Sequence, residues 1–246
     1  MSSLVLAHTR YQLLEQIRVP IGLVASAFFP AASMLAFVVP FAGDDPVGAT
    51  RATGSMMMIG AMSASVMGLS ISVAQDREQP WNPYLRTLPA GPFPRFAGRV
   101  LTTMAVMLMA VVPVLVIAAL LTKATVTGPQ LAFGLGALLL GSLPFMLIGL
   151  FLGFLLPSKA AIGVSQVVFF PMAIVGGLFM PPQVMPEFLQ AISPYAPSRG
   201  AVELVWSVTT GSAPNVTGIV MLVAWTVAAA LAAAWAYRRD EGRRFS

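Results

Sequence analysis

Residues 100–122 read VLTTMAVMLMAVVPVLVIAALLT, a stretch that contains no Asp, Glu, Lys or Arg. A helix rises about 1.5 Å per residue, so about 20 apolar residues cross the ~30 Å hydrocarbon core of a bilayer. Five more stretches are equally free of charge, and the six predict transmembrane helices near residues 20–42, 52–75, 98–121, 130–156, 160–180 and 214–237. Helices satisfy their own backbone hydrogen bonds, and these stretches lack the apolar–polar alternation of a membrane barrel. We therefore predict an all-α integral membrane protein.

The composition supports a single membrane domain over residues 1–246. Hydrophobic residues make up 57% of the chain and charged residues only 9%, whereas a water-soluble domain carries roughly 25% charged residues. The chain has no cysteine, which excludes disulfides and thiolate metal sites, and its one histidine, His8, excludes a histidine-cluster metal site. We predict no catalytic, cofactor-binding or metal-binding residue.

The basic residues are distributed unequally between the two sides of the predicted spans. One side collects Arg10, Arg18, Arg77, Arg86, Arg95, Arg99, Lys159, Arg238, Arg239, Arg243 and Arg244. The other side holds only Arg51, Lys123 and Arg199. The positive-inside rule then predicts that both termini and residues 76–99 face the cytoplasm of a multi-pass protein in the inner or plasma membrane. These charges lie scattered beside apolar spans, a pattern that does not indicate a nucleic-acid partner.

The N-terminal residues 1–18 predict an amphipathic helix. Leu6, Leu13, Leu14 and Ile17 share one stripe of a helical projection, and polar residues lie across from it. Such a helix fits the plane of the cytoplasmic membrane interface better than a seventh span.

The absence of charge inside the spans argues against proton-coupled carriers and ion pumps. Proton-coupled carriers and ion pumps usually carry an ionisable residue within the membrane, and none of the cores of the six predicted helices contains one. The acidic residues lie near loops or ends, where Asp44 and Asp45 have the pattern of a solvated turn. The chain also lacks the glycine-rich Gly-Lys-Ser/Thr loop that binds ATP phosphates, so any ATP must be bound by a partner.

Two connecting segments carry further information. Residues 75–99 mix aromatic, charged and proline residues. Trp81 and Tyr84 there are either anchors of an ordinary interfacial loop or part of a short helix, near residues 80–88, that docks on a soluble partner. Residues 176–203 are too apolar for an exposed loop and too rich in proline for a span, so we expect short helices that enter the outer leaflet.

Several short motifs in these segments resemble those of one known family. They are Thr87-Leu-Pro89 before the third span, Gly177-Leu-Phe-Met-Pro181 after the fifth, and then Pro186-Glu-Phe-Leu189, Ile192-Ser-Pro-Tyr-Ala-Pro197 and Arg199. Together with the pattern of six spans, they resemble the ABC type-2 permease family. This family includes daunorubicin-resistance-type drug exporters and exporters of polysaccharides and lipids.

The resemblance implies roles for particular residues. A cytoplasmic coupling helix between the second and third spans would contact the ATPase through Asp76, Glu78, Trp81, Tyr84, Arg86 and Thr87. The sequence departs from the family after the acidic residue, where Gln79-Pro80 replaces the usual Gly-Thr. Re-entrant short helices between the fifth and sixth spans would form an outer gate with Pro181, Pro186, Glu187, Pro194, Tyr195 and Arg199.

Small residues and methionines within the spans permit two interpretations each. Gly149 and Gly153 allow close helix packing, either within the subunit or between two copies. The adaptable side chains of Met57, Met58 and Met62 either line a transport pathway or fill space between helices.

The family resemblance therefore implies a permease subunit of an ATP-driven exporter, which is not itself an enzyme. It would pair with a second permease copy or a sister permease and bind two ATPase subunits, which hold ATP and Mg. The uncharged spans predict an apolar or amphiphilic substrate, such as a drug, an antibiotic or a lipid-like molecule. The alternatives are a secondary carrier or channel not powered by ATP, and a membrane scaffold that transports nothing.

Overall fold

The computed structural model describes residues 2–18, 21–80 and 93–242, and over these residues the chain is helical without strands. The elements, where η marks π- and 3-10 helices, are α1 (Ser2–Arg18), α2 (Ile21–Ser33), η1 (Met34–Val38), α3 (Val39–Ala42), α4 (Pro46–Met62), η2 (Ser63–Gly68), α5 (Leu69–Glu78), α7 (Phe93–Leu121), α8 (Gly128–Gly141), α9 (Leu143–Leu155), α10 (Ser158–Val175), η3 (Pro182–Val184), α11 (Glu187–Ile192), η4 (Ser193–Tyr195), α12 (Pro197–Thr210) and α13 (Val216–Gly242).

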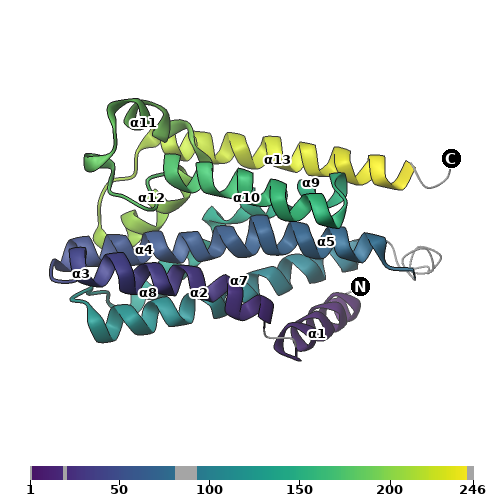
Figure 1. Ribbon diagram of the computed structural model, residues 1–246, viewed down its shortest axis with the longest axis horizontal. Helices are drawn as coiled ribbons and strands as arrows, with labels where there is room; N and C mark the ends of the chain where they lie inside the picture. The colour runs from purple at the N-terminus through teal and green to yellow at the C-terminus, as the bar shows by residue number, and fades with distance from the viewer. Residues whose placement is uncertain (1, 19–20, 81–92, 243–246) are drawn as a thin grey trace.

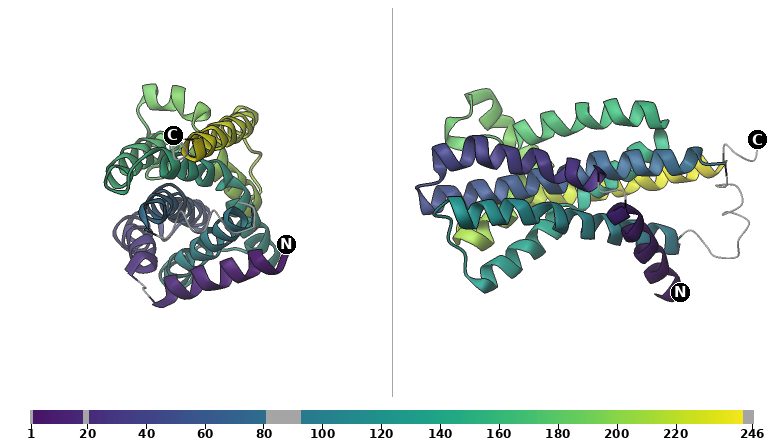
Figure 2. Two further views of the ribbon diagram at one scale, coloured as in Figure 1. Left: turned by 90° about the vertical axis from the view of Figure 1, so that its right-hand side faces the viewer. Right: turned by 60° about the horizontal axis from the view of Figure 1, so that its bottom comes forward.

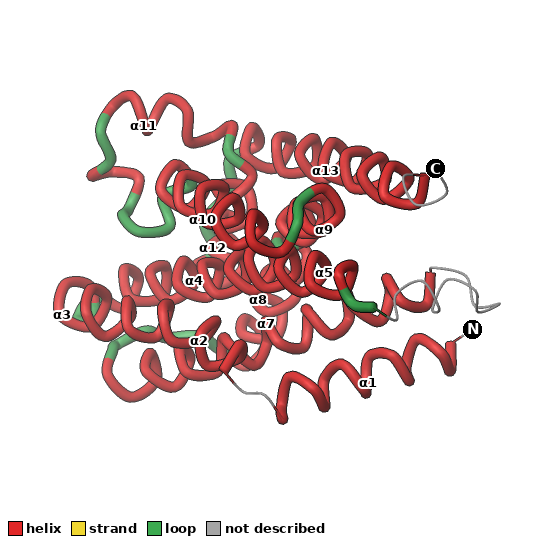
Figure 3. Tube along the Cα trace, turned by 45° about the vertical axis from the view of Figure 1, so that its right-hand side comes forward, coloured by secondary structure: helices red, strands yellow, loops and turns green. Residues whose placement is uncertain are grey.

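The long helices run side by side along the long axis of the molecule, so they form a bundle with two distinct ends (Figure 1). We call the end where α5 and α13 finish the terminal end, because both chain termini lie there. The opposite end carries α3, α11 and the connections α7–α8 and α12–α13. Figure 3 shows that the connections gather at these two ends while helix fills the space between them.

Five helical stretches among the described residues are long and apolar enough to cross a membrane. They are Pro46–Glu78, Phe96–Leu121, Gly128–Leu155, Ser158–Val175 and Val216–Asp240. The first predicted span is also helical, over α2, η1 and α3, but its described apolar part, Ser26–Ala42, is shorter than the other five. The membrane fold is thus confirmed, while the layout of six crossings stays a prediction.

The stretch Pro46–Glu78 is the most deeply buried of the five. It begins earlier than predicted because Asp45 caps it: the Asp45 carboxylate accepts the backbone N–H of Val47 at 3.3 Å and of Gly48 at 2.8 Å. Proline at the first helical position, here Pro46, lacks the N–H that would otherwise be unpaired. The extension brings Arg51 from a predicted connection into the helix.

Two predicted spans differ from the observed helices for local reasons: the fourth is divided and the fifth is shorter. The fourth span bends at Ser142 and divides into α8 and α9, because Pro144 has no N–H to donate to the carbonyl of Leu140. The fifth stops at Val175 rather than near residue 180. Gly177 there has φ of 74°, and the N–H of Leu178 bonds to Ala173 O at 3.1 Å, a pattern that terminates helices.

Close approach between helices depends on glycine. A Cβ on Gly153 would lie 2.6 Å from Val73 Cβ, and one on Gly149 would collide with the carbonyl oxygen of Ser65. The two glycines therefore pack α9 against η2 and α5 of the same subunit, which is the first of the two predicted meanings.

The N-terminal helix α1 lies beside the bundle and packs on α7 (Figure 2). The contact with α7 includes polar groups: Thr102 Oγ1 donates to Gln12 Oε1 at 3.1 Å, and Gly98 leaves room for His8. Leu6 and Ile17 of the predicted apolar stripe are exposed. The helix is confirmed, and its position in a membrane interface stays a prediction.

Candidate functional site

Arg77, near the end of α5, contacts the end of α9. Its Nη1 donates to the carbonyl oxygens of Gly153 at 2.8 Å and Leu156 at 3.1 Å. Carbonyls at a helix C-terminus lack partners within the helix and carry partial negative charge, so a guanidinium there is stabilising. Arg77 thereby fixes the end of α9 to α5.

Arg77 also forms an ion pair with α13. Its Nη2 lies 2.5 Å, and its Nε 3.0 Å, from Oδ1 of Asp240. The Asp240 side chain is only 5% exposed, so the pair is shielded from solvent. A charge-assisted pair with two donors on one carboxylate holds α13 in a defined position beside α5 and α9.

Glu78, the next residue, contacts the start of α10. Its carboxylate accepts the backbone N–H of Ser158 at 2.8 Å and the Ser158 hydroxyl at 2.5 Å. An acidic group is favourable at a helix N-terminus, where backbone N–H groups are unpaired. We call the group formed by Arg77, Glu78, Ser158 and Asp240 the α5 junction.

Aromatic packing surrounds the α5 junction from the other helices. The rings of Phe96, Phe154 and Tyr237, from α7, α9 and α13, meet edge to face with centroids 4.7 to 5.4 Å apart. Such pairs add about 0.5–1.5 kcal/mol each beyond burial. The terminal ends of α5, α7, α9, α10 and α13 are therefore joined into one unit.

A second ion pair connects α5 to α7 at the same end. Arg99 donates to the carboxylate of Asp76, next to a cleft of about 300 Å³ between α1, α5 and α7. Gln12 and Glu15 of α1 also line this cleft. Asp76 thus faces α7 and α1, whereas Glu78 faces α10.

The predicted coupling residues fall into two groups. Asp76 and Glu78 lie in the last turn of α5, before the segment where we predict the coupling helix. That helix, near residues 80–88, with Trp81, Tyr84, Arg86 and Thr87, lies almost wholly outside the described residues. The pairing roles of Arg77, Ser158 and Asp240 were not predicted from the sequence. Their partners are 76 or more residues away in the chain, and no local pattern identifies such pairs.

At the opposite end, short helices follow α10 as the sequence predicts. Pro186 precedes α11, Glu187 is exposed in its first turn, and Pro194 lies in η4. Exposed Pro181 precedes η3, and Tyr195 O accepts the indole N–H of Trp225 at 3.0 Å. Their depth in a membrane, and their role as a gate, stay predictions.

Arg199 lies in the first turn of α12, where it pairs with a residue that the sequence analysis did not select. Its Nε is 2.6 Å from Oε1 of Glu203, one helical turn later, and Glu203 Oε2 accepts the N–H of Asn215 at 2.6 Å. The guanidinium also lies over the ring of Trp206, 5.2 Å from its centroid. The hydrogen bond from Asn215 to Glu203 therefore ties α12 to the residue before α13, and Arg199 holds Glu203 in place for it. An acidic residue four positions after Arg199 could have predicted this ion pair from the sequence.

The three methionines proposed for a pathway are buried inside this subunit. Met58 and Met62 have no exposed surface, and Met57 is 5% exposed. Met57 also borders an apolar cavity near the opposite end. Their role in transport stays a prediction.

Comparison with known proteins agrees with this architecture. The sequence profile described as ABC-2 type transporter matches residues 3–209. A Bacillus subtilis (strain 168) protein named "Putative transport permease YvfS" is 25% identical over 187 residues, which make up 76% of this chain and 76% of that protein. The profile extends from α1 to α12 and so includes Arg77, Glu78 and Ser158 of the α5 junction and the Arg199–Glu203 pair, while Asp240 lies beyond it. The chain therefore belongs to the ABC-2 type transporter family.

Proposed function

We propose that this chain is the permease subunit of an ATP-driven exporter that moves an apolar or amphiphilic molecule out of the cell. It works with a second permease, either another copy or a sister chain, and with two ATPase subunits that bind ATP and Mg. The terminal end faces the cytoplasm, in the inner or plasma membrane. Family membership supports this proposal, as does the B. subtilis relative, whose name describes a transport permease.

The observation that carries the proposal is the α5 junction. Arg77 and Glu78 bind α9, α10 and α13, and they directly precede the segment where the family resemblance places the ATPase contact. A displacement of that segment would act on α5 first and then on the three helices bound to it. The junction thus offers a short physical path from a cytoplasmic motor to the spans.

The small number of buried charges in the spans supports an apolar or amphiphilic cargo. Among the described residues, the buried charged side chains are Glu203 and Asp240, and both are paired with arginine. An ion crossing between such helices would find no unpaired opposite charge, whereas an apolar molecule needs none. An apolar or amphiphilic cargo follows.

The test is ATP-driven transport by the complex with its ATPase in proteoliposomes. We expect Glu78→Gln to lower transport per ATP hydrolysed severalfold, because it replaces the charge-assisted hydrogen bonds to Ser158 with neutral ones. The ATPase should still co-purify with this variant. Ser158→Ala keeps the backbone donor and should have a smaller effect.

Asp44→Asn serves as the matched control, because the Asp44 side chain is 97% exposed, pairs with Lys123 at the opposite end and lies away from the α5 junction. Unchanged coupling in both Glu78→Ala and Trp81→Ala would refute the coupling path. Transport driven by an ion gradient without ATP would instead identify a secondary carrier. Stable ATPase binding without any transport would identify a scaffold.

A further inference from the structure

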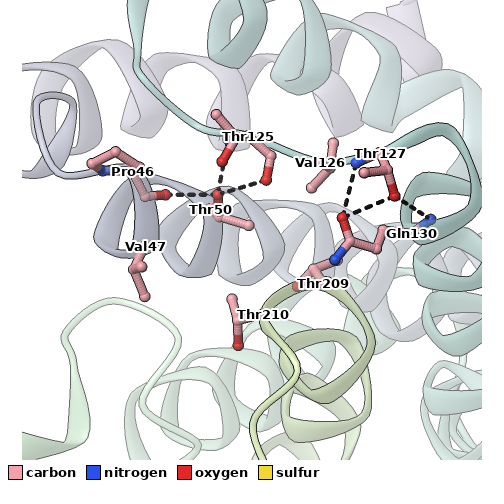
Figure 4. A pocket seen from close by; sticks show the side chains of 9 residues that line it. All are labelled: Pro46, Val47, Thr50, Thr125, Val126, Thr127, Gln130, Thr209 and Thr210. Atoms are coloured by element: carbon pink, nitrogen blue, oxygen red, sulfur yellow. Dashed lines mark hydrogen bonds between the residues drawn. The ribbon is translucent and has the colours of Figure 1, made fainter.

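A cavity opens at the opposite end of the bundle, between the start of α4, the α7–α8 connection and the end of α12. Its outer part has a volume of about 350 Å³, and Figure 4 shows the side chains around it. Much of the lining is polar but uncharged, with Thr50, Thr125, Thr127, Gln130 and Thr210. This part is the mouth of the cavity.

An inner part with a volume of about 250 Å³ adjoins the mouth. It lies among α4, α7, α8 and α12, and its lining is almost wholly apolar, including Met57, Leu115 and Val205. Thr50 and Thr209 line both parts, so the two parts adjoin at these side chains. Each volume is near the lower end of ligand sites, roughly 300–1,000 Å³.

The hydrogen bonds at the mouth fix its polar groups and leave some of their capacity unused. The Thr50 hydroxyl donates to Pro46 O at 2.7 Å and accepts the N–H of Thr125 at 3.1 Å. Gln130 Oε1 accepts the N–H and the hydroxyl of Thr127, at 2.9 and 3.0 Å. The Gln130 amide nitrogen still has protons to donate, and threonine hydroxyls that donate to their own helix keep lone pairs.

The described residues that line the two parts of the cavity include no charged side chain. The Lys123 ammonium lies 2.8 Å from Asp44 Oδ1, and this hydrogen bond lowers the pKa of Asp44. The Asp45 carboxylate is occupied by the first N–H groups of α4. An ionic ligand would lose hydration here without gaining an opposite charge.

The contrast between the two parts selects the chemistry of a ligand. A hydrocarbon would fill the inner part but would cover the polar groups of the mouth without hydrogen-bonding to them, which is unfavourable. A wholly polar molecule would gain nothing from the apolar lining. We propose that the cavity binds an uncharged amphiphile, with its apolar body in the inner part and a hydroxyl or amide head at the mouth.

This inference rests on the proposed function for its physiological meaning, since a molecule held here would be cargo or a regulator of transport. The cavity lies within one subunit, so the site does not require a second permease for its formation. Binding can therefore be measured on the purified chain alone, before any test of transport.

The absence of cysteine makes a clean binding test available, because one introduced thiol is the only one present. Thr209→Cys, at the boundary of the two parts, would be labelled with a small maleimide in phosphatidylcholine nanodiscs. We expect decan-1-ol at about nine times its Kd to slow labelling about tenfold, because mass action leaves about one site in ten empty. Decyl sulfate and decane, at equal membrane concentrations, should protect far less.

Two matched controls separate the site from general effects on the membrane. Ala213→Cys lies in the exposed α12–α13 connection, outside the cavity lining, and its labelling should not change with decan-1-ol. Adding Ala119→Phe to Thr209→Cys fills the inner part and should abolish protection, whereas Leu120→Phe, which points away from the cavity, should preserve it. If Ala119→Phe does not fold, Ala124→Leu replaces it.

Equal protection by decane or by decyl sulfate would overturn the proposal, as would failure of Thr209→Cys to react at all, which would show a closed mouth. Protection without ATP-driven transport by the complete complex would support the site and reject the proposed function. ATP-driven transport without protection by decan-1-ol would support the proposed function and reject the site.

Discussion

Two carboxylates are buried among the described residues, Glu203 and Asp240, and each lies against an arginine from one end of the bundle. Breaking one partner of a buried ion pair costs about 3–5 kcal/mol, because it leaves an uncompensated charge. The Arg199–Glu203 pair also holds the N–H of Asn215. At the residue scale, it is the most sensitive polar contact of the opposite end.

We expect Glu203→Gln to lower the stability of the purified chain by about 3 kcal/mol, since Arg199, whose side chain is only 16% exposed, would lose its counter-charge. Thermal unfolding in detergent would measure this as a lower Tm. Glu187→Gln changes the same charge at an exposed position and should stay within about 0.5 kcal/mol. Equal Tm values for the two variants would show that the pair contributes nothing.

The contact partners of individual residues were harder to predict from the sequence than the helices. Asp76 and Glu78 were selected through a family resemblance, yet their partners, Arg99 and Ser158, are set by tertiary packing. Arg199 was selected without Glu203, although a spacing of four residues on a helix is a readable signal. A pair such as Arg77–Asp240 spans 163 positions, and a single sequence does not encode such a distance locally.

At the scale of elements, hydrophobic length predicted most helices well, because lipid requires long runs without charge. The errors in helix boundaries have local causes. Single residues in the sequence specify them, but the length of an apolar stretch does not reveal them. Asp45 begins α4 six residues early, Pro144 divides the fourth span, and Gly177 ends the fifth. The π-helical turn Ser63–Gly68 had no recognised signal.

Helix contacts that depend on glycine give a prediction at this scale. Gly149→Ala should destabilise the chain by about 1–3 kcal/mol, because the added Cβ meets the carbonyl oxygen of Ser65 and overpacks the contact of α9 with η2. Gly136→Ala, in α8, meets open space and should be neutral or stabilising by up to about 1 kcal/mol. Denaturant titration of both variants would compare them, and similar losses would argue against a specific contact at Gly149.

At the scale of the whole molecule, the distribution of basic residues predicts its orientation, and an accessibility experiment can test it. Lys159→Cys lies at the terminal end and Ala213→Cys at the opposite end, both at exposed positions. A membrane-impermeant maleimide should label Ala213→Cys in intact cells, and Lys159→Cys only after the cells are permeabilised. The reverse pattern would place residues 76–99 outside and would remove the proposed ATPase contact.

The α5 junction has one more consequence. If motion of the segment after Glu78 shifts α10 and α13, then a ligand that favours one arrangement of those helices changes the affinity of the permease for the ATPase. Coupling between two binding equilibria is reciprocal, so the ATPase must change the affinity for that ligand by the same factor. Through the contacts Arg77–Asp240 and Glu78–Ser158, bound cargo would thus change ATPase binding before any nucleotide is hydrolysed.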